Sequence, residues 1–474
     1  MSRIKIPRSE YYDKVLACWL GKNIGGTLGT PYEGQKFVHC LSYFDPVPEK
    51  PLPNDDLDFQ LVWLKMLEDR GVKVEFAHFV EHWLKYLSNH WYAEYSFCLY
   101  NLQRGLRPPV SGTFQNYFVD EMGSPIRSEI WACVAPGDPQ LAASMAWMDS
   151  CLDHAGGEGQ YGEMFWAAVE SAAFVVKDPE TLIDIGLSMI PTSSNIYRVI
   201  KEAVWCYKSG MKWDAAREHI VTLFGHHQPC NAIPNHGFTI LGWLYGKDYG
   251  DKLCKAVNCG YDTDCTGATL GSLLGILYGT AGIPEEWLKP VGREIILVPL
   301  TGQFNHPKTV DELAERTVKI GEKFLRENSQ VSEIAEESST PPNLLSILFR
   351  NDKPMKLLCF DVHSAVEKVG DLDIVLHYNG EPIVRDGVEK ILEVSILKDW
   401  APQRKGIEVE VPKGWVMSEL EWKVDRWQFK VSTENAEDRN EIKVKLAEGE
   451  ASFTILSAKS IKMIPAAQSA PREG

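Results

Sequence analysis

Two short acidic segments carry the residue types best suited to chemistry in this chain. Residues 54–58 read NDDLD, and residues 262–266 read DTDCT. A single Asp at the start of a helix is explained by capping of the first turn. Several adjacent carboxylates, however, repel one another unless a positive group lies among them. Because hard divalent cations such as Mg²⁺ prefer oxygen ligands, we expect the two segments to converge on one metal site.

Each acidic segment leads directly into an apolar helical run. The run after the second segment contains small residues at Gly267, Ala268, Gly271, Ser272 and Gly275. Small residues allow a second helix to approach closely, so this helix is expected at the centre of the domain. Carboxylates at the entrance of a buried helix need compensation by a positive charge. This favours a shared metal site over two independent helix caps.

Helical periodicity dominates the first 328 residues. Apolar residues recur at helical spacing in residues 10–20, 56–67, 76–87, 139–149, 162–174, 195–209, 213–224 and 309–326. Strand-like alternation is nearly absent from this part. We therefore expect residues 1–328 to form an all-α domain.

The pattern changes after residue 328. Residues 329–345 are polar, contain Pro341-Pro342 and are expected to form a linker. Alternating segments follow at residues 356–362, 372–377, 390–396, 406–411, 419–424, 427–431, 441–446 and 452–457. Asn379-Gly380 is a hairpin signal. We expect a small antiparallel β-sandwich over residues 346–465 and a disordered tail over 466–474.

Composition excludes some classes of protein. The net charge of −16 argues against nucleic-acid binding, which needs a basic face. Eleven cysteines, an odd number, indicate reduced thiols rather than a disulfide framework. No signal peptide and no membrane-spanning run is recognisable. We therefore expect a cytoplasmic protein without a membrane partner; the sequence does not indicate an oligomeric state.

Both acidic segments resemble the metal-binding motifs of the ADP-ribosylglycohydrolase family. Further resemblance lies in the Gly-rich residues 21–34, in residues 123–127 (GSPIR), and in residues 135–139 with the Asp153-His154 pair. It spans roughly residues 10–285 and does not reach the β region.

The resemblance implies an all-α orthogonal helical bundle with two Mg²⁺ ions, for which Mn²⁺ is a possible substitute. It implies hydrolysis of an N- or O-glycosidic bond at the anomeric carbon of a ribose, in a small-molecule or ADP-ribosylated substrate. By position, the metal ligands would be Asn54, Asp55, Asp56, Asp262 and Asp264.

The chain departs from the family pattern at two of these positions. Asn54 and Cys265 stand where many members have Thr. An amide carbonyl replaces a hydroxyl as a hard oxygen donor, whereas a thiol is a poor ligand for Mg²⁺. Thr266 is the alternative ligand, although a helical residue there would point about a quarter turn away. One metal position is thus expected to be weaker or differently liganded.

The candidate catalytic residues are Glu33, Asp55 and Asp264. The resemblance places Glu33 near the scissile bond, as the carboxylate that moves a proton, and Asp55 or Asp264 would bridge the metals.

The candidate substrate contacts are Asp58, Arg127 with the preceding Gly123 and Ser124, and His154. Asp58 is equally explained as a surface charge, and a His at the position of His154 as a cap or as a hydrogen-bonding residue of the core.

Three functions remain open from the sequence. The first is a glycohydrolase that removes ADP-ribose. The second is a hydrolase of another furanoside or nucleoside-like glycoside, which an appended β domain favours slightly. The third is a metal-stabilised binding protein without catalysis.

Overall fold

The computed structural model describes residues 3–461, so the expected disordered tail at 466–474 lies outside the described residues. Contacts divide the chain into two compact units, neither of which is continuous in sequence. The first comprises residues up to Val74, Asp120–Asp149 and Gly157–Cys359, and the second comprises Glu75–Val119, Ser150–Gly156 and the chain from Phe360 onward. The domain boundaries predicted from the sequence, 1–328, 329–345 and 346–465, concern which parts of the chain fold independently. They stay a prediction.

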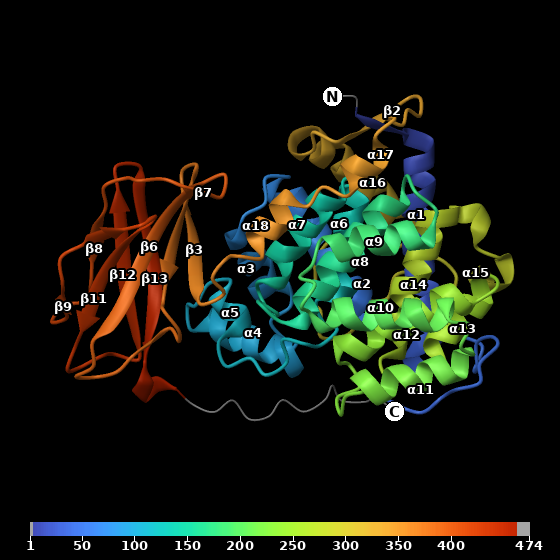
Figure 1. Ribbon diagram of the computed structural model, residues 1–474, viewed down its shortest axis with the longest axis horizontal. Coiled ribbons are helices and arrows are strands. Elements are labelled where there is room, and N and C mark those ends of the chain that lie inside the picture. The colour runs from blue at the N-terminus through green and yellow to red at the C-terminus, as the bar shows by residue number, and fades with distance from the viewer. Residues whose placement is uncertain (1–2, 462–474) are drawn as a thin grey trace. The chain divides into compact units, whose positions relative to one another are not determined.

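The first unit is built from helices (Figure 1). Their bounds are α1 Arg8–Gly29, α2 Asp55–Arg70, α6 Ser128–Val134, α7 Pro139–Ser150, α8 Glu158–Ala173, α9 Pro179–Ser188, α10 Asn195–Lys208, α11 Trp213–Phe224, α12 Ala232–Tyr245, α13 Tyr249–Val257, α14 Thr263–Tyr278, α15 Glu285–Val291, α16 Val310–Asn328, α17 Leu344–Leu348 and α18 Asp352–Leu357, with short 3₁₀ turns η1 Thr30–Tyr32, η2 Pro125–Arg127 and η3 Thr280–Gly282. Each helical run predicted from the sequence lies within an observed helix, to within one residue at either end. Among the helices described, none combines the length and the apolar character needed to cross a membrane.

The expected linker at 329–345 contains regular structure. Strand β2, Ser332–Ala335, pairs in parallel with β1, Ile4–Pro7. The side chains of Ile4, Ile6 and Ser332 are buried. The segment is therefore fixed to the start of α1.

A seam of glycines joins α1 to α14, and this seam determines where the acidic segments lie. A Cβ atom at Gly21, Gly25 or Gly29 would come within 2.0, 1.9 or 2.1 Å of a backbone oxygen on the partner helix, at Gly271, Gly267 or Thr263 respectively. Both helices repeat glycine every four residues, which places these glycines on one face. The predicted close approach of a second helix to the small residues of α14 is confirmed, and α1 is that helix.

The second unit combines two β-sheets with helices α3 Phe76–Tyr86, α4 Ala93–Gln103 and α5 Val110–Thr113 (Figure 1). The larger sheet has the order β10-β11-β6-β4-β3, with β7 paired to β6 and β9 paired to β11, and is antiparallel; the smaller has the order β5-β13-β12-β8. The strands are β3 Ser364–Val369, β4 Leu372–His377, β5 Ile383–Val384, β6 Lys390–Lys398, β7 Ala401–Pro402, β8 Glu408–Glu410, β9 Val416–Met417, β10 Glu421–Lys423, β11 Arg426–Ser432, β12 Arg439–Leu446 and β13 Gly449–Ser457.

One hydrophobic core serves both sheets. It contains Ile374 of β4 and Val394 of β6 together with Ile442 of β12 and Phe453 of β13. Two sheets with a common core form a β-sandwich. The predicted sandwich is therefore confirmed, although one pair in the smaller sheet, β5 with β13, is parallel.

Two local predictions in this region were wrong. Asn379-Gly380 forms a turn with positive φ angles of 48° and 101°, but it leads from β4 in one sheet to β5 in the other and makes no hairpin. The turn signal fixes a local backbone shape and does not determine which strands pair. Residues 356–362, predicted as a strand, begin within α18, where Pro354 and Leu357 are buried three residues apart.

Candidate metal centre

Asn54 links the two acidic segments. It is the N-cap of α2, and its Oδ1 accepts a hydrogen bond from the backbone N–H of Asp56 at 2.8 Å. Its Nδ2 lies 3.4 Å from Oδ2 of Asp264, to which it donates. A Cβ at Gly26 would lie 2.7 Å from the same Nδ2. The glycine on α1 thus leaves the space that the Asn54 side chain occupies.

Asp56, Asp264 and Cys265 form the first group of possible metal ligands. One carboxylate oxygen from each Asp and the Sγ atom of Cys265 all lie within 4.8 Å of one another. The Cys265 thiol donates to Oδ1 of Asp56 at 3.4 Å. All three side chains are buried. The expected convergence of the two segments is therefore observed.

Glu33, Cys230 and Asp262 form a second such group, again with ligand atoms within 4.8 Å of one another. The loop that carries Glu33 is tied to the second acidic segment through its backbone: Gly34 N–H donates to the Tyr261 carbonyl, and Tyr261 N–H donates to the Gln35 carbonyl, both at 2.8 Å. Glu33 itself is exposed, in contrast to Asp262. The group therefore opens toward solvent on the Glu33 side.

Arg217 also fixes the loop that carries Glu33. Its guanidinium donates to the Cys259 carbonyl at 3.0 and 3.1 Å and to the Lys36 carbonyl at 2.5 Å. It thereby holds the chain before Asp262 against the chain after Glu33.

The carboxylates of both groups are electrostatically unfavourable as they stand. Burial raises the pKa of Asp56 well above its usual value, and so do Asp264 and Asp55, while Lys22 opposes the shift. Burial also raises the pKa of Asp262, and the nearby Asp264 and Glu33 raise it further. The pKa of Asp264 is raised by burial as well. A cation among these groups would reverse this repulsion.

Unsatisfied oxygen atoms supply the direct test of whether a cation fits. Oδ2 of Asp56, Oδ1 of Asp262 and Oδ1 of Asp264 are buried without a hydrogen-bond partner. Buried carboxylate oxygens without partners are costly, and oxygen atoms of this kind are the ligands of hard divalent cations. The donor set fits a metal, with a thiol beside each group of carboxylates.

The other predicted metal ligands differ in their surroundings. Asp55 is partly exposed in the first turn of α2, where its charge acts on Asp56 and Asp264. Thr266 is buried, and its hydroxyl donates to the Thr263 carbonyl of its own helix at 3.2 Å. Of the two alternatives, Cys265 is the residue that lies with the carboxylates.

A buried ionic network supports the first turn of α2. Lys22 of α1 donates to Glu129 Oε1 at 2.8 Å and to the Ile126 carbonyl at 3.1 Å. Gln60 of α2 donates to the other oxygen of Glu129 at 2.8 Å. Since both partners of the Lys22–Glu129 pair are buried, this network fixes α1, α2 and α6 relative to one another.

Asp58 is fully buried, so the interpretation as a surface charge was wrong. Its Oδ2 accepts hydrogen bonds from Val298 N–H at 2.9 Å and from the Thr301 hydroxyl at 2.7 Å. This carboxylate anchors the loop before α16. A contact with substrate stays a prediction.

Arg127 is also fully buried, and its guanidinium is occupied by protein groups. It pairs with Asp149 at 2.9 Å and lies 3.8 Å from Glu163, and it donates to the Gly123 carbonyl at 2.5 Å. Ser124 donates to the same Glu163. Gly123, Ser124 and Arg127 are thus joined in one network, and their contact with substrate stays a prediction.

His154 belongs to the second compact unit. Its ring lies 3.0 Å from Asp153 and 3.6 Å from Glu94. Burial alone would lower its pKa, but these two carboxylates outweigh burial and raise it to about 9. The two carboxylates thus favour the protonated form of this buried imidazole, and its role toward a substrate stays a prediction.

Cys230 and Asn235 lie at the centre but were not among the site residues predicted from the sequence. Asn235 of α12 accepts a hydrogen bond from Asp262 N–H at 3.2 Å, while its amide donates to the carbonyls of Pro229 and Asn231. Burial, and then Asp262, raises the pKa of the Cys230 thiol. Both residues lie in the segment GHHQPCNAIPNHG, residues 225–237, which also contains three histidines.

The match to a protein-family model agrees with the resemblance. The model of the family described as ADP-ribosylglycohydrolase matches residues 7–325. A protein of Pseudomonas putida (strain GB-1), named ADP-ribosylarginine hydrolase Tri1, is 36% identical over 67 residues, which are 14% of this chain and 18% of that protein. A solved structure described as an ADP-ribosylglycohydrolase-related protein complex is similar over 68% of this chain and all of that chain, with 18% identity and a TM-score of 0.46.

Proposed function

Because the chain belongs to the ADP-ribosylglycohydrolase family through residues 7–325, we propose that it hydrolyses an N- or O-glycosidic bond to a ribosyl group in a metal-dependent reaction. The observation that carries this proposal is the convergence of Asp56, Asp262 and Asp264, each with a buried oxygen that lacks a hydrogen-bond partner. The family supports the type of reaction, and the donor set supports its dependence on a metal.

We assign the two groups of ligand atoms to two cation positions. Asp56, Asp264 and Cys265 would hold one cation, and Asp262, Cys230 and Glu33 lie at the other. Asp55 and Asn54 stand at the edge of the first position. Bound there, a pair of divalent cations would orient the ribose diol and lower the pKa of an attacking water.

Residues of the chain would transfer the proton, stabilise charge and position the site. Glu33 is exposed at the open side of the centre, so its carboxylate is positioned to accept the proton of the water or to protonate the leaving group. Cleavage of a ribosyl bond develops positive charge at the anomeric carbon, and the acidic surroundings stabilise that charge. Arg217 and Asn235 keep the Glu33 and Asp262 segments in place through backbone hydrogen bonds.

The thiols bear on which metal is used. Each group of ligand atoms contains one cysteine sulfur, Cys265 in the first and Cys230 in the second. Thiolate is a poor ligand for Mg²⁺ and a better one for transition metals. We therefore expect Mn²⁺ to bind more tightly than Mg²⁺, although both would be accepted by the carboxylates.

The decisive experiment measures product release with and without metal. The purified chain, stripped with a chelator and reloaded with Mg²⁺ or Mn²⁺, is incubated with ADP-ribosyl-arginine, ADP-ribosyl-serine and a panel of aryl furanosides. ADP-ribosyl-arginine is the first choice because the partial match in P. putida is named for that substrate. Release of ADP-ribose that requires metal supports the proposal. Release only from the furanosides would replace ADP-ribose with another sugar as substrate, and bound metal without any turnover would refute catalysis.

The matched variants are Asp264→Asn and Asp214→Asn. Asp264 lies in the centre, whereas Asp214 is exposed at the start of α11 and accepts a hydrogen bond from the adjacent Ala215 N–H. We expect Asp264→Asn to lose activity and metal affinity together and Asp214→Asn to retain both.

A further inference from the structure

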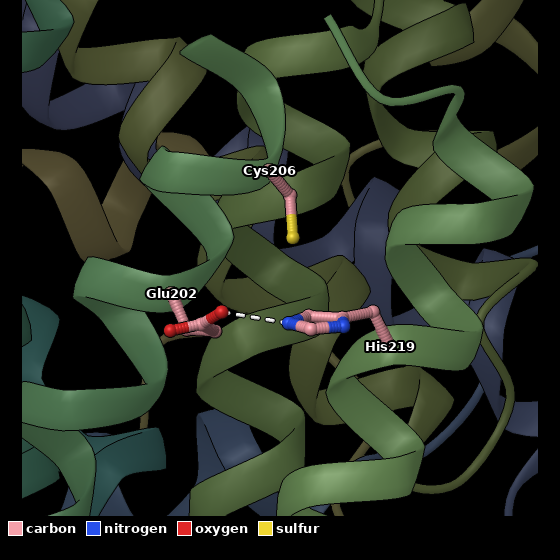
Figure 2. Close-up of side chains that lie close together, drawn as sticks. All are labelled: Glu202, Cys206 and His219. Atoms are coloured by element: carbon pink, nitrogen blue, oxygen red, sulfur yellow. Dashed lines mark hydrogen bonds and ion pairs between the residues drawn. The ribbon is translucent and has the colours of Figure 1, made fainter. Parts of the chain in front are cut away.

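A second group of possible metal ligands lies on the helical pair α10–α11. Glu202 and Cys206 are four residues apart on α10 and therefore share one face of that helix. His219 projects from α11 toward both of them, as Figure 2 shows. One ligand atom from each residue lies within 4.8 Å of the other two. None of these residues belongs to the acidic centre described above.

Local contacts hold the end of α10 and the His219 ring in place. The short connection after α10 folds back on the helix, because Ser209 Oγ and Met211 N–H both donate to the Cys206 carbonyl, at 2.9 and 3.1 Å. The imidazole of His219 packs against the indole of Trp205 with ring centroids 5.6 Å apart. The ligand atoms are therefore presented by a preformed helical hairpin.

Donor chemistry selects the kind of ion. A thiol sulfur, an imidazole nitrogen and a carboxylate oxygen are together the ligand types of Zn²⁺, whereas Mg²⁺ and Ca²⁺ prefer oxygen alone. We propose that Glu202, Cys206 and His219 form a zinc site that is separate from the acidic centre. The three side chains provide three of the four positions of a tetrahedral Zn²⁺, and water completes the set.

Access from solution agrees with an open fourth position. The side chains of Glu202 and His219 are 31% and 30% exposed, and only Cys206 is buried. Without metal, His219 Nε2 and Glu202 Oε1 make a hydrogen bond of 2.6 Å. Around a tetrahedral zinc these two atoms would stand about 3.3 Å apart, so a small side-chain rotation converts the pair into ligands.

A simple ion pair accounts for Glu202 and His219 but not for the thiol beside them. A partly exposed pair of this kind contributes little to stability, and it needs no sulfur atom within 4.8 Å of both partners. The zinc site uses all three residues.

The test is zinc binding by the full-length chain, measured by titration calorimetry with ZnCl₂. Because Cys230 and Cys265 also lie near carboxylates, the parent protein for this experiment carries Cys230→Ser and Cys265→Ser and is held in excess Mg²⁺. We expect Cys206→Ser and His219→Gln each to weaken one zinc site at least about 100-fold, since loss of an outer-shell partner alone costs 10–100-fold.

The matched controls are Cys359→Ser, which removes an exposed thiol outside the group, and Glu180→Gln, which removes an exposed carboxylate on α9. Both should bind zinc as the parent does. Unchanged zinc affinity and stoichiometry in Cys206→Ser and His219→Gln would overturn the proposal.

A spectroscopic readout separates direct ligation from an indirect effect on folding. In the same Cys230→Ser, Cys265→Ser parent, Co²⁺ substituted for Zn²⁺ should give a thiolate-to-metal charge-transfer band in the near ultraviolet. Adding Cys206→Ser should remove that band while the circular dichroism spectrum stays the same. Persistence of the band in Cys206→Ser would show that the sulfur ligand is another cysteine and would refute the assignment.

Discussion

Substitution of Gly25 by Ala tests whether the seam between α1 and α14 builds the acidic centre. A Cβ at position 25 would lie 1.9 Å from the Gly267 oxygen, whereas real Cβ contacts essentially never fall below 3.0 Å. The two backbones would have to separate by at least about 1.1 Å, because the clash is with backbone and not with a flexible side chain. The first turn of α14, with Asp264 and Cys265, would move with the helix.

Two opposing effects determine how much Gly25→Ala changes the free energy of unfolding. Overpacking a fitted interface costs about 1–3 kcal/mol and sometimes more, and a backbone clash belongs at the upper end. Replacing Gly by Ala inside a helix gains about 1 kcal/mol. We therefore expect Gly25→Ala to lower the free energy of unfolding by about 2 kcal/mol or more and to weaken Mn²⁺ binding in the folded protein.

Urea unfolding and calorimetric titration with Mn²⁺ are the assays. Gly406→Ala is the control, because a Cβ there meets nothing within 4 Å. The sign of the change in the free energy of unfolding distinguishes close packing of the seam from helix propensity. If Gly25→Ala is as stable as the parent or more stable, helix propensity alone governs this position and the close packing of the seam is refuted.

Three further predictions concern single side chains. Glu33→Gln should lower kcat about 10²–10⁴-fold with little change in melting temperature, because Glu33 is exposed; a rate close to that of the parent would remove Glu33 from the reaction. Cys265→Ser should raise the dissociation constant of Mn²⁺ relative to that of Mg²⁺. An unchanged ratio of the two constants in calorimetry would show that the thiol is no ligand. The pKa of His154 is raised to about 9, so its contribution to stability, about 3 kcal/mol, is fully present below pH 6.5 and is lost as the pH rises through 9. Urea unfolding of the parent should show that loss and His154→Gln should not, whereas a pKa at or below 6.5 for His154 by NMR would contradict the charge assignment.

The burial of Asp58 and Arg127 could not be predicted from the sequence. Both charged groups have protein partners: Val298 and Thr301 donate to Asp58, and Arg127 lies beside Asp149 and Glu163. A charged side chain near a recognised motif looks functional in the sequence, because the sequence does not show which distant groups neutralise it.

Cys230 could not be recognised as a site residue from the sequence. Nothing in its immediate neighbours distinguishes it from the other cysteines, and only the fold brings it within 4.8 Å of Glu33 and Asp262. The signal for Cys230 was indirect. This cysteine directly precedes Asn231, the N-cap of α12, and α12 also carries Asn235.

The helices and the acidic segments of this protein were determined locally. Periodicity defines the helical runs, an Asn–Asp–Asp cap begins α2, and small residues in α14 require a close partner helix, because each of these depends on residues that are neighbours in the chain. The partner itself, the thiols beside the carboxylates and the compensation of each buried charge were decided by tertiary structure. Many of them depend on contacts between residues far apart in the chain, such as Asn54 with Asp264, and no local pattern encodes which of many chemically similar groups will meet.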